Sequence, residues 1–476
     1  MARHPNLIGG EWRTGEPFLN INPSDLDDII GEYARATVED CREAIAAARS
    51  AGKAWGLAPP QTRADLLYKV AAGIEAEAGQ LADLLAREEG KTLREAAGEV
   101  LRAVHLFRFY AGEALRGPGE RYDSSRPGIE IQVTREPVGV VGLITPWNFP
   151  LGIPAWKIAP ALAWGNAVVL KPADLVPGCA WELARIIHEA GVPPGVFNLV
   201  MGRGSVVGAE IIDNPGVDAV SFTGSVQTGA KVLQGTALRG AKVQMEMGGK
   251  NPLVVLADAD IDRAVQVALD GAYYGTGQRC TASSRLIVED AIHDKFVAGL
   301  TKALAAQVVD DARKPGTTIG PVVDQRQYEQ DLRYLDIGRG EAQLAWGGMP
   351  LERATRGYYL QPALFTEARN DMTIARDEIF GPVAAVIRVR DYEEALAIAN
   401  DTPFGLSAGI CTTSLKYAQH FRRHAQAGMV MVNCPTAGVD YTAAFGGRKA
   451  SSYGSREQGR YAVEFYTTVK TAYQAI

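Results

Sequence analysis

Cysteine and histidine are scarce in this chain of 476 residues, which holds five of the first and six of the second. The cysteines are scattered and odd in number, and no two form a Cys-x-x-Cys pair; they are Cys41, Cys179, Cys280, Cys411 and Cys434. This usage favours a reducing cytoplasm over a disulfide framework or a zinc site. The histidines show no His-Glu-x-x-His spacing, so we expect no protein-bound metal.

Long apolar runs and a surplus of positive charge are also missing. No segment approaches the roughly 18 consecutive apolar residues of a membrane-spanning helix, and the first residues lead into no apolar stretch of a signal peptide. The net charge is −6, with both signs mixed along the chain and no basic stripe. We therefore expect a cytoplasmic protein that binds neither membranes nor nucleic acid.

The chain does have length and regular patterning. At 476 residues it is too long for one core, so we expect two or three domains. From Thr37 to about Ala111 the pattern is helical, with a capping-box-like start at Thr37 and Asp40 and further helical stretches near 60–88 and 92–113. The segment 129–135 alternates apolar and polar residues, as an exposed strand does.

Two series of short strands and helices come next, and their alternation predicts parallel sheets. The first has strands at 138–145, 167–171, 196–201 and 219–223, with helices near 154–164, 178–190 and 205–213. After a strand at 251–256 and a helix near 259–272, the second has strands at 286–288, 382–389, 407–412 and 429–433, with helices near 293–306, 391–400 and 414–425. Because ligand sites favour domain interfaces and the carboxyl ends of parallel strands, we expect the chemistry between the two series.

Cys280 differs from the other cysteines in lying in a polar loop. It follows Gln278 and Arg279, and nearby positive charge favours the reactive thiolate. Glu246 lies among methionines and glycines, which would raise its pKa as a general base requires. Taken singly, a lone cysteine is commonly an inert core residue, and such a glutamate is often a cap or an ion-pair partner.

Polar or glycine-rich turns follow several predicted strands. Asn148, between Trp147 and Phe149, offers a donor for an oxyanion. Lys171 with Asp174 offers partners for ribose hydroxyls, and Ser225 can cap a helix whose N-terminus attracts phosphate. The run from Gly202 to Gly208 is similar to a dinucleotide fingerprint with its last glycine one residue late. Each turn also has an ordinary structural explanation when taken alone.

In their order along the chain, these motifs resemble those of the aldehyde dehydrogenase superfamily. The seven matching stretches are Thr145–Pro150, Lys171–Asp174, Phe222–Ser225, Glu246–Lys250, Gly277–Cys280, Glu378–Pro382 and Phe445–Lys449. The resemblance implies an α/β fold of three parts. A Rossmann-like cofactor domain would span 1–116 and 138–248, an α/β catalytic domain 249–448, and a small β oligomerisation flap and tail 117–137 and 449–476.

The resemblance also implies roles for single residues. Cys280 would be the nucleophile, Asn148 with the Cys280 amide would hold the oxyanion, and Glu246 would activate water. The cofactor, NADP or NAD, would contact Ile144, Pro146, Trp147, Lys171, Ala173, Asp174, Gly204, Gly208, Phe222, Gly224, Ser225, Gly248, Glu378 and Phe380. The substrate would contact Phe149, Ile153, Trp156, Arg279, Thr281 and Phe445, in a funnel that is apolar except for its arginine.

The implied reaction is NAD(P)-dependent oxidation of an aldehyde to a carboxylic acid through a thiohemiacetal and a thioester. Glu246 argues against the branch in which coenzyme A takes the acyl group. Asp174 stands where glutamate is usual, and its shorter side chain leaves room for a 2′-phosphate, so NADP is expected to be usable beside NAD.

The substrate class rests on two further stretches. Gly277–Ala282 and the tail 446–460 resemble the branch that oxidises 2-oxoglutarate semialdehyde (2,5-dioxopentanoate) in sugar-acid catabolism, although Ala444 and Ala450 depart from it. Arg279 would hold a carboxylate, or only pair locally and tune Cys280. The alternative is a broad-specificity aliphatic or aromatic aldehyde dehydrogenase, which the apolar funnel favours. A homodimer or homotetramer joined through the flap is expected.

Overall fold

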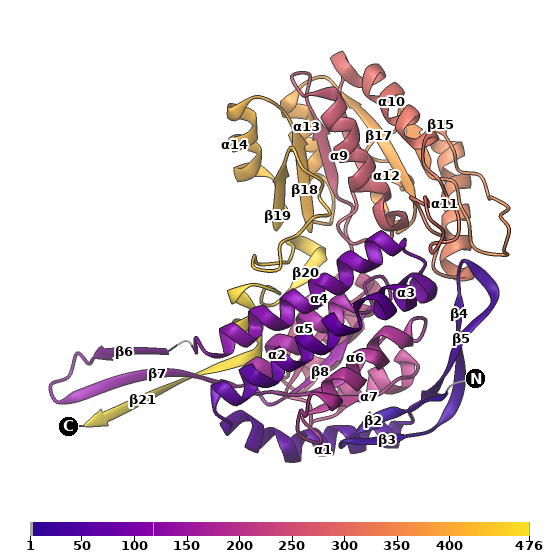
Figure 1. Ribbon diagram of the computed structural model, residues 1–476. Coiled ribbons are helices and arrows are strands. Elements are labelled where there is room, and N and C mark those ends of the chain that lie inside the picture. The colour runs from indigo at the N-terminus through magenta and orange to yellow at the C-terminus, as the bar shows by residue number, and fades with distance from the viewer. Residues whose placement is uncertain (1–2, 118, 476) are drawn as a thin grey trace.

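The computed structural model describes residues 3–117 and 119–475, which form two lobes and a projecting flap (Figure 1). The lower lobe in the figure holds most of the chain before residue 249, and the upper lobe holds most of the chain after it. The flap extends to one side, with the C-terminus at its tip. The predicted α/β class is confirmed, since both lobes are built on parallel sheets.

The lower lobe is built on an eight-stranded sheet in the order β20-β12-β11-β8-β9-β10-β2-β3. Its parallel strands are Val140–Ile144 (β8), Ala167–Lys171 (β9), Phe197–Leu199 (β10), Ala219–Thr223 (β11) and Lys242–Glu246 (β12). The antiparallel strands at its margins are Asn6–Ile8 (β2), Glu11–Arg13 (β3) and Ser452–Tyr453 (β20). The strand order reverses between β8 and β11, and their carboxyl ends therefore flank a switch point at which ligands bind in such sheets.

The helices of this lobe are Val38–Leu57 (α1), Pro60–Ala76 (α2), Ala78–Glu89 (α3), Leu93–Ala114 (α4), Gly152–Ala163 (α5), Pro177–Glu189 (α6), Ala209–Asp213 (α7, after a π-helical turn at Gly204–Gly208) and Val226–Leu238 (α8). The predicted capping box is confirmed, because Thr37 Oγ1 accepts the Asp40 amide at 3.1 Å and Asp40 accepts the Thr37 amide at 2.7 Å. The stretch near 60–88 is two helices rather than one, because the backbone at Glu77 leaves helical geometry. Helix α5 is buried along its whole length and is apolar except for Lys157.

The upper lobe is built on a seven-stranded sheet in the order β15-β16-β17-β14-β13-β18-β19. Its strands are Pro252–Val255 (β13), Arg285–Glu289 (β14), Gln343–Trp346 (β15), Ala363–Thr366 (β16), Val383–Val389 (β17), Ser407–Cys411 (β18) and Met429–Val432 (β19). Its helices are Ile261–Tyr273 (α9), Asp290–Ala305 (α10), Gln325–Glu341 (α11), Thr373–Arg376 (α12), Tyr392–Asn400 (α13) and Leu415–His424 (α14). Of these elements, α11, α12, β15 and β16 were not predicted.

Two smaller sheets complete the fold. Strands Arg3–His4 (β1), Glu16–Asn22 (β4) and Asp25–Arg35 (β5) form one, and the tip of the β4–β5 hairpin reaches the upper lobe, where Pro23 accepts the Tyr358 amide at 3.0 Å. Strands Gly119–Asp123 (β6), Ile129–Pro137 (β7) and Thr467–Ala475 (β21) form the flap. The short helix Val463–Tyr466 (α15) precedes β21. The predicted tail, 449–476, therefore contributes one strand to each of two sheets: β20 joins the lower sheet and β21 joins the flap.

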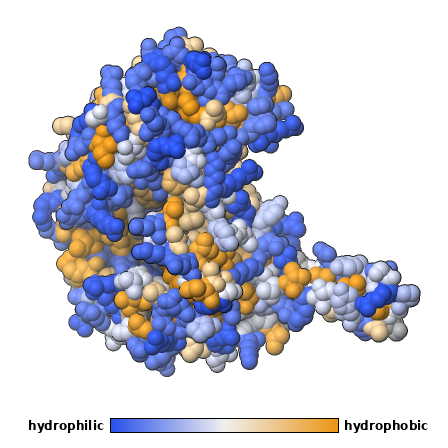
Figure 2. All heavy atoms as spheres, turned by 180° about the vertical axis from the view of Figure 1, so that it is seen from behind, coloured by the Kyte–Doolittle hydropathy of each residue, from blue (hydrophilic) through white to orange (hydrophobic). Residues whose placement is uncertain are grey.

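The molecular surface is mostly polar. Figure 2 shows hydrophilic residues over much of the face opposite to that of Figure 1, and a hollow between the two lobes above the flap. Within the described part of the chain, no helix is both long enough and apolar enough to cross a membrane.

Candidate active site

The predicted catalytic residues come from the edges at which the two sheets face each other. Asn148 follows β8 and Glu246 ends β12, so both lie at carboxyl ends of the lower sheet. Cys280 precedes β14 and therefore lies at an amino end of the upper sheet. The expectation that the chemistry lies at carboxyl ends thus holds for the lower sheet alone. The connection 247–251 leads directly from the carboxyl end of β12 to the amino end of β13. The amino ends of the upper strands therefore face the carboxyl ends of the lower strands.

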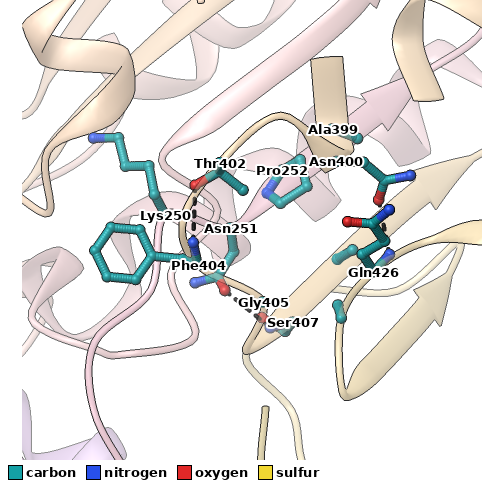
Figure 3. A pocket seen from close by; sticks show the side chains of 12 residues that line it. Lys250, Asn251, Pro252, Ala399, Asn400, Thr402, Phe404, Gly405, Ser407 and Gln426 are labelled. Carbon is teal, nitrogen blue, oxygen red and sulfur yellow. Dashed lines mark hydrogen bonds between the residues drawn. The ribbon is translucent and has the colours of Figure 1, made fainter. Parts of the chain in front are cut away.

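The Cys280 loop is held from several directions. Asn251 donates to the carbonyls of Cys280 and Ala282 at 2.8 and 2.9 Å, and its Oδ1 accepts the Ser407 amide at 3.0 Å. Figure 3 shows Asn251 and Ser407 lining a small pocket at this junction. Gly277, with φ of +68°, has no room for a side chain, because a Cβ there would lie 2.2 Å from a backbone oxygen. The loop around the nucleophile is therefore rigidly placed.

Asn148 faces this loop from the lower lobe. Its Nδ2 donates at 3.0 Å to the carbonyl of Gln278, two residues before Cys280, and the Asn148 side chain is buried. The second N–H of this amide has no acceptor among the described residues. A buried amide beside a nucleophile, with a donor to spare, is suited to stabilising an oxyanion.

Helix α4 carries a buried carboxylate that the sequence patterns did not single out. Glu99 pairs with Lys91 Nζ at 2.6 Å, and its other oxygen accepts the amides of Leu151 and Gly152 at 3.0 and 2.8 Å. Lys91 Nζ also donates to the carbonyl of Asn148 at 2.8 Å. Burial lowers the pKa of Lys91, but Glu89 and Glu99 outweigh burial and raise it. This pair therefore fixes the Asn148 loop and the start of α5.

Glu95, one turn earlier on α4, fixes the loop of Cys280 as Glu99 fixes the loop of Asn148. Its Oε1 accepts the Gly275 amide at 2.7 Å, five residues before Cys280. Its Oε2 completes a capping box with Thr92 at the start of α4. The only sequence signal for these roles is that Glu95 and Glu99 are one helical turn apart on a helix whose other buried residues are mostly apolar. One helix thus holds both catalytic loops.

Glu246 has the environment that the sequence predicted for a base. Its carboxyl is buried, Oε2 accepts from Ser452 at 2.5 Å, and Oε1 has no partner among the described residues. Burial and the neighbouring Glu457 raise its pKa well above the ordinary range, against the Ser452 bond and the charge of Lys157. Glu457 itself pairs with Lys157 in the buried interior. A carboxyl of raised pKa can take up a proton from water or from a thiol.

Arg279 does not make Cys280 a thiolate by itself. Burial raises the pKa of the Cys280 thiol to about 12, and the charges of Glu378 and Glu246 contribute. Arg279 lowers this pKa, as its position in the sequence predicted, but it is outweighed. The expected effect of the neighbouring positive charge is therefore confirmed in direction, but burial and the two carboxylates determine the net shift of the thiol pKa. Deprotonation has to be coupled to a base.

The guanidinium of Arg279 is anchored to α9. Its Nη2 donates to the carbonyls of Asp270 and Gly271 at 2.8 and 3.2 Å, and its Cζ lies 4.8 Å from the centre of the Tyr274 ring. It forms no ion pair among the described residues. The side chain is thus rigid and lies at the wall of a cavity.

That cavity, of about 220 Å³, has several charged side chains in its lining. Its ionic lining consists of Glu89, Lys91, Glu95, Glu99, Arg102 and Arg279, joined by Asn148, Phe149 and Tyr274. Helix α4 contributes to this cavity carboxylates and an arginine that the motifs do not contain, and the apolar funnel around Phe149, Ile153, Trp156 and Phe445 stays a prediction. Of the predicted substrate residues, Phe149 and Arg279 line this cavity, whereas Ile153, Trp156, Thr281 and Phe445 are buried and are not among its lining residues.

The predicted cofactor residues gather at the carboxyl edge of the lower sheet. Lys171 Nζ bonds Asp174 Oδ1 at 2.9 Å, and Gly204 and Gly208 pack beside the Lys171 methylenes. Ser225 caps α8 by accepting the Thr228 amide at 3.3 Å. The remaining predicted residues of this edge also lie at strand ends. They are Ile144 at the end of β8, Pro146 and Trp147 after it, Ala173 after β9, Phe222 near the end of β11 and Gly224 after it.

Several features of this edge fit a dinucleotide. The hydroxyls of Thr145 and Thr223, at the ends of the neighbouring strands β8 and β11, are buried without a partner among the described residues. They flank the switch point, beside the free amides of the α8 N-terminus that attract phosphate. Orphaned donors and a helix N-terminus at one crevice are the groups that a ribose and a pyrophosphate require.

Glu378 closes the cofactor edge from the upper lobe. Its Oε1 accepts the Gly249 amide at 2.8 Å, and a Cβ on Gly248 would lie 1.8 Å from its Oε2, so only glycine fits at 248. Burial raises the pKa of Glu378 to about 7. Phe380, at φ +65°, meets the edge of the Trp147 ring with centroids 5.3 Å apart. The motif residues of both lobes thus meet at one place.

Comparisons with known proteins agree with this arrangement. The profile of the aldehyde dehydrogenase family matches residues 12–472. The chain is 44% identical to an alpha-ketoglutaric semialdehyde dehydrogenase of Bacillus subtilis, covering 98% of this chain and 97% of that protein. It is 40% identical to a 2,5-dioxopentanoate dehydrogenase of Saccharolobus solfataricus, with 97% of each chain covered. A betaine aldehyde dehydrogenase of Staphylococcus aureus, solved in complex with NAD+, superposes with a TM-score of 0.97 at 33% identity, covering 99% of this chain and 95% of that one.

Replacing Glu99 with glutamine tests the buried pair. The change leaves the Lys91 charge without its closest partner, so we expect the free energy of unfolding to fall by about 3–5 kcal/mol in urea denaturation. Glu75→Gln is the matched control, because it breaks the exposed pair with Arg108 and should cost about 0–1 kcal/mol. If both variants lost the same free energy of unfolding, the buried pair would stabilise the fold no more than the exposed pair does, which would contradict its role.

The protonation of Cys280 is tested by alkylation with iodoacetamide, followed peptide by peptide. Because the thiol pKa is raised to about 12, the rate at Cys280 should still be climbing at pH 10. Arg279→Met removes a charge that lowers this pKa and should slow the reaction at every pH. The exposed Cys434 serves as an internal reference. A plateau for Cys280 near the ordinary thiol value of about 8.5 would contradict the assignment.

Proposed function

Since the chain belongs to the aldehyde dehydrogenase family and is an NAD(P)-dependent oxidoreductase that acts on aldehydes, we propose that its substrate is 2-oxoglutarate semialdehyde and its product 2-oxoglutarate. The observation that carries the proposal is the charged cavity beside Asn148 and Arg279. A broad enzyme for aliphatic or aromatic aldehydes would need an apolar cavity. Two relatives named for this substrate, matched over nearly their whole length, support the same choice. Sugar-acid breakdown is the setting that we propose for it.

In the first step, the Cys280 sulfur bonds to the aldehyde carbon, and the carbonyl oxygen becomes an oxyanion. The free N–H of Asn148 Nδ2 and the Cys280 amide stabilise that charge, and losing one such donor typically costs on the order of 100–1000-fold in rate. The thiol proton passes to Glu246, whose raised pKa suits it to receive one. The result is a thiohemiacetal on Cys280.

NAD(P)+, when bound, accepts the hydride that leaves the thiohemiacetal carbon. Lys171, Asp174 and Glu378 would hold its ribose hydroxyls, Gly224 and Ser225 its pyrophosphate, and Trp147 and Phe380 would line its nicotinamide end. Departure of the hydride leaves a thioester on Cys280. Glu246, after giving up its first proton, takes another from water, and the hydroxide displaces the Cys280 thiolate. The sum is aldehyde, water and oxidised cofactor giving acid, reduced cofactor and a proton.

The pairing of Lys171 with Asp174 bears on the choice between the two cofactors. The Asp174 carboxylate is drawn back to Lys171, and its side chain is 42% exposed. A shorter acid held in this way leaves room for a 2′-phosphate and supports the use of NADP beside NAD.

We also propose that the protein is located in a reducing cytoplasm, because catalysis needs a free Cys280. Cell fractionation would test this location.

We propose that the protein assembles through the flap into a dimer or tetramer. The edge strands β6 and β21 leave Tyr122, Val469 and Tyr473 exposed at 48, 58 and 61%. Exposed apolar side chains on an unpaired strand edge favour pairing with another chain.

Kinetics test the substrate directly. With NAD+ and NADP+ in turn, 2-oxoglutarate semialdehyde should show a kcat/KM at least about tenfold above that of pentanal, a neutral aldehyde of the same length. One 2-oxoglutarate should form per reduced cofactor, without coenzyme A. Cys280→Ala should abolish the reaction. A wild-type enzyme that uses pentanal equally well would return the assignment to the broad-specificity alternative.

The oligomer is tested by light scattering of the eluting protein. Wild type should have the mass of two or four chains, and Val469→Asp should lower it by placing charge on the β21 edge. Val308→Asp is the control, because Val308 is similarly exposed but lies in the upper lobe. A wild-type monomer, or a loss of mass in both variants, would contradict assembly through the flap.

A further inference from the structure

One face of helix α11 is polar and lies against the loop that contains Glu378. Gln327, Gln330, Asp331 and Tyr334 are spaced as i, i+3, i+4 and i+7, which places them on one side of the helix. The buried face of a helix at this spacing is usually apolar. Each of these four side chains instead contacts the loop 377–381, so the polar face calls for a role in placing that loop.

Two glutamines and a tyrosine of this face hold the backbone and the start of the loop. Gln327 Nε2 and Gln330 Nε2 donate to the carbonyl of Ile379 at 3.0 and 2.9 Å. A carbonyl oxygen has two lone pairs, so this acceptor is saturated from α11 alone. The Tyr334 hydroxyl donates to Asp377 Oδ2 at 3.0 Å. The loop is therefore attached to α11 on both sides of its glutamate.

Asp331 supports the end of the same loop. Its side chain is buried, Oδ1 accepts Gln327 Nε2 at 2.8 Å, and Oδ2 has no partner among the described residues. A Cβ on Gly381 would lie 2.3 Å from both carboxyl oxygens, so the backbone of the loop rests directly on this carboxyl. The Gly381 carbonyl in turn is the atom that leaves no room for a side chain at Gly277, in the loop of Cys280.

A carboxyl in this place is tolerated only without its charge. Burial raises the pKa of Asp331 well above the ordinary range, against the hydrogen bond from Gln327. In the described part of the chain, no basic side chain pairs with it. Because an unpaired buried carboxylate is costly, the group keeps its proton at neutral pH. Asp331 thus serves as a compact acceptor and as a surface for the backbone, and an amide of the same shape can do both.

The loop is strained at the residue that lies between these attachments. Phe380 has a φ of +65°, in the left-handed region that costs free energy for any residue with a side chain. Strain of this kind persists only where the surroundings enforce it, and it is concentrated at functional sites. The bonds to Ile379 and the contact with Gly381 fix the backbone immediately before and after Phe380. Helix α11 therefore enforces the strained turn.

We propose that Asp331 is a positioning residue for the cofactor, which together with Gln327 and Gln330 holds the loop 377–381 in the shape that presents Glu378 and Phe380 to NAD(P)+. The inference rests on the proposed function for the cofactor contacts of the last two residues, and it is independent of which aldehyde is oxidised. Asp331 acts through the loop that rests on it. Without that support the turn relaxes, and binding then includes the free energy of ordering it again.

The test is a calorimetric titration of the whole enzyme with NAD+ and with NADP+, without aldehyde. Asp331→Ala removes the acceptor of Gln327 and the surface below Gly381, so the Kd should rise about tenfold. Asp331→Asn, which is uncharged and has the same shape, should stay within about twofold of wild type. Asp336→Ala on the same helix is the control, because it breaks only an exposed pair with Arg339 and should leave the Kd unchanged.

Steady-state kinetics with 2-oxoglutarate semialdehyde separate positioning from a general loss of structure. Asp331→Ala should raise the KM for the cofactor as it raises the Kd, while kcat at saturating cofactor changes by less than about threefold. Urea denaturation of the cofactor-free variants reports the stability of the fold in parallel. Should Asp331→Ala fail to fold, Gln330→Met, which removes one donor to Ile379 at similar volume, should raise the Kd about fivefold.

A lower stability of Asp331→Ala with an unchanged Kd would overturn the proposal, since Asp331 would then only support the fold. A Kd for Asp331→Asn as high as that for Asp331→Ala would overturn it as well. Glu378→Gln separates this inference from the proposed function. If Glu378→Gln leaves the Kd unchanged and Asp331→Ala raises it, the positioning role stands and the ribose contact of Glu378 falls. If Glu378→Gln alone raises the Kd, the ribose contact stands and the positioning role falls.

Discussion

The active site depends on one structural constraint, the attachment of two catalytic loops from different lobes to helix α4. Glu99, through Lys91 and the first amides of α5, fixes the loop of Asn148. Glu95 fixes the loop of Cys280 through Gly275. An oxyanion site tolerates little error in the placement of its donors. Buried ionic bonds of defined direction give that accuracy where apolar contacts would allow the loops to slide.

The same burial sets the chemistry of the groups that it brings together. Cys280 and Glu246 are both desolvated, so the pKa values of the thiol and the carboxyl are both raised. The thiol is protected from adventitious reaction, and the carboxyl becomes basic enough to take protons in either half of the reaction. Arg279 lowers the pKa of the Cys280 thiol and so offsets only a part of this rise. Arg279 also lines the cavity beside Asn148, together with Arg102.

Much of this could be predicted from the sequence, because the motifs at strand ends occur in a recognisable order. Strand β4 could not, because its apolar pattern is inverted: Asn20 and Asn22 face inward, while Leu19 and Ile21 are 49 and 44% exposed. Helix α11 was missed because it buries so few residues. Glu99, Lys91 and Arg102 were missed for a different reason. Periodicity identifies a buried helix face, but the partners that make a buried charge tolerable come from segments far away in sequence.

The central claim, covalent oxidation of an acidic aldehyde at Cys280 with release by Glu246, is tested most directly by trapping the acyl enzyme. Glu246→Gln, mixed with 2-oxoglutarate semialdehyde and NAD(P)+ and quenched in acid, should be examined by peptide mass spectrometry. The account predicts that the Cys280 peptide gains the mass of one 4-carboxy-4-oxobutanoyl group, while one equivalent of reduced cofactor forms in a burst. A burst with no adduct on Cys280, or an adduct on another cysteine, would contradict the account.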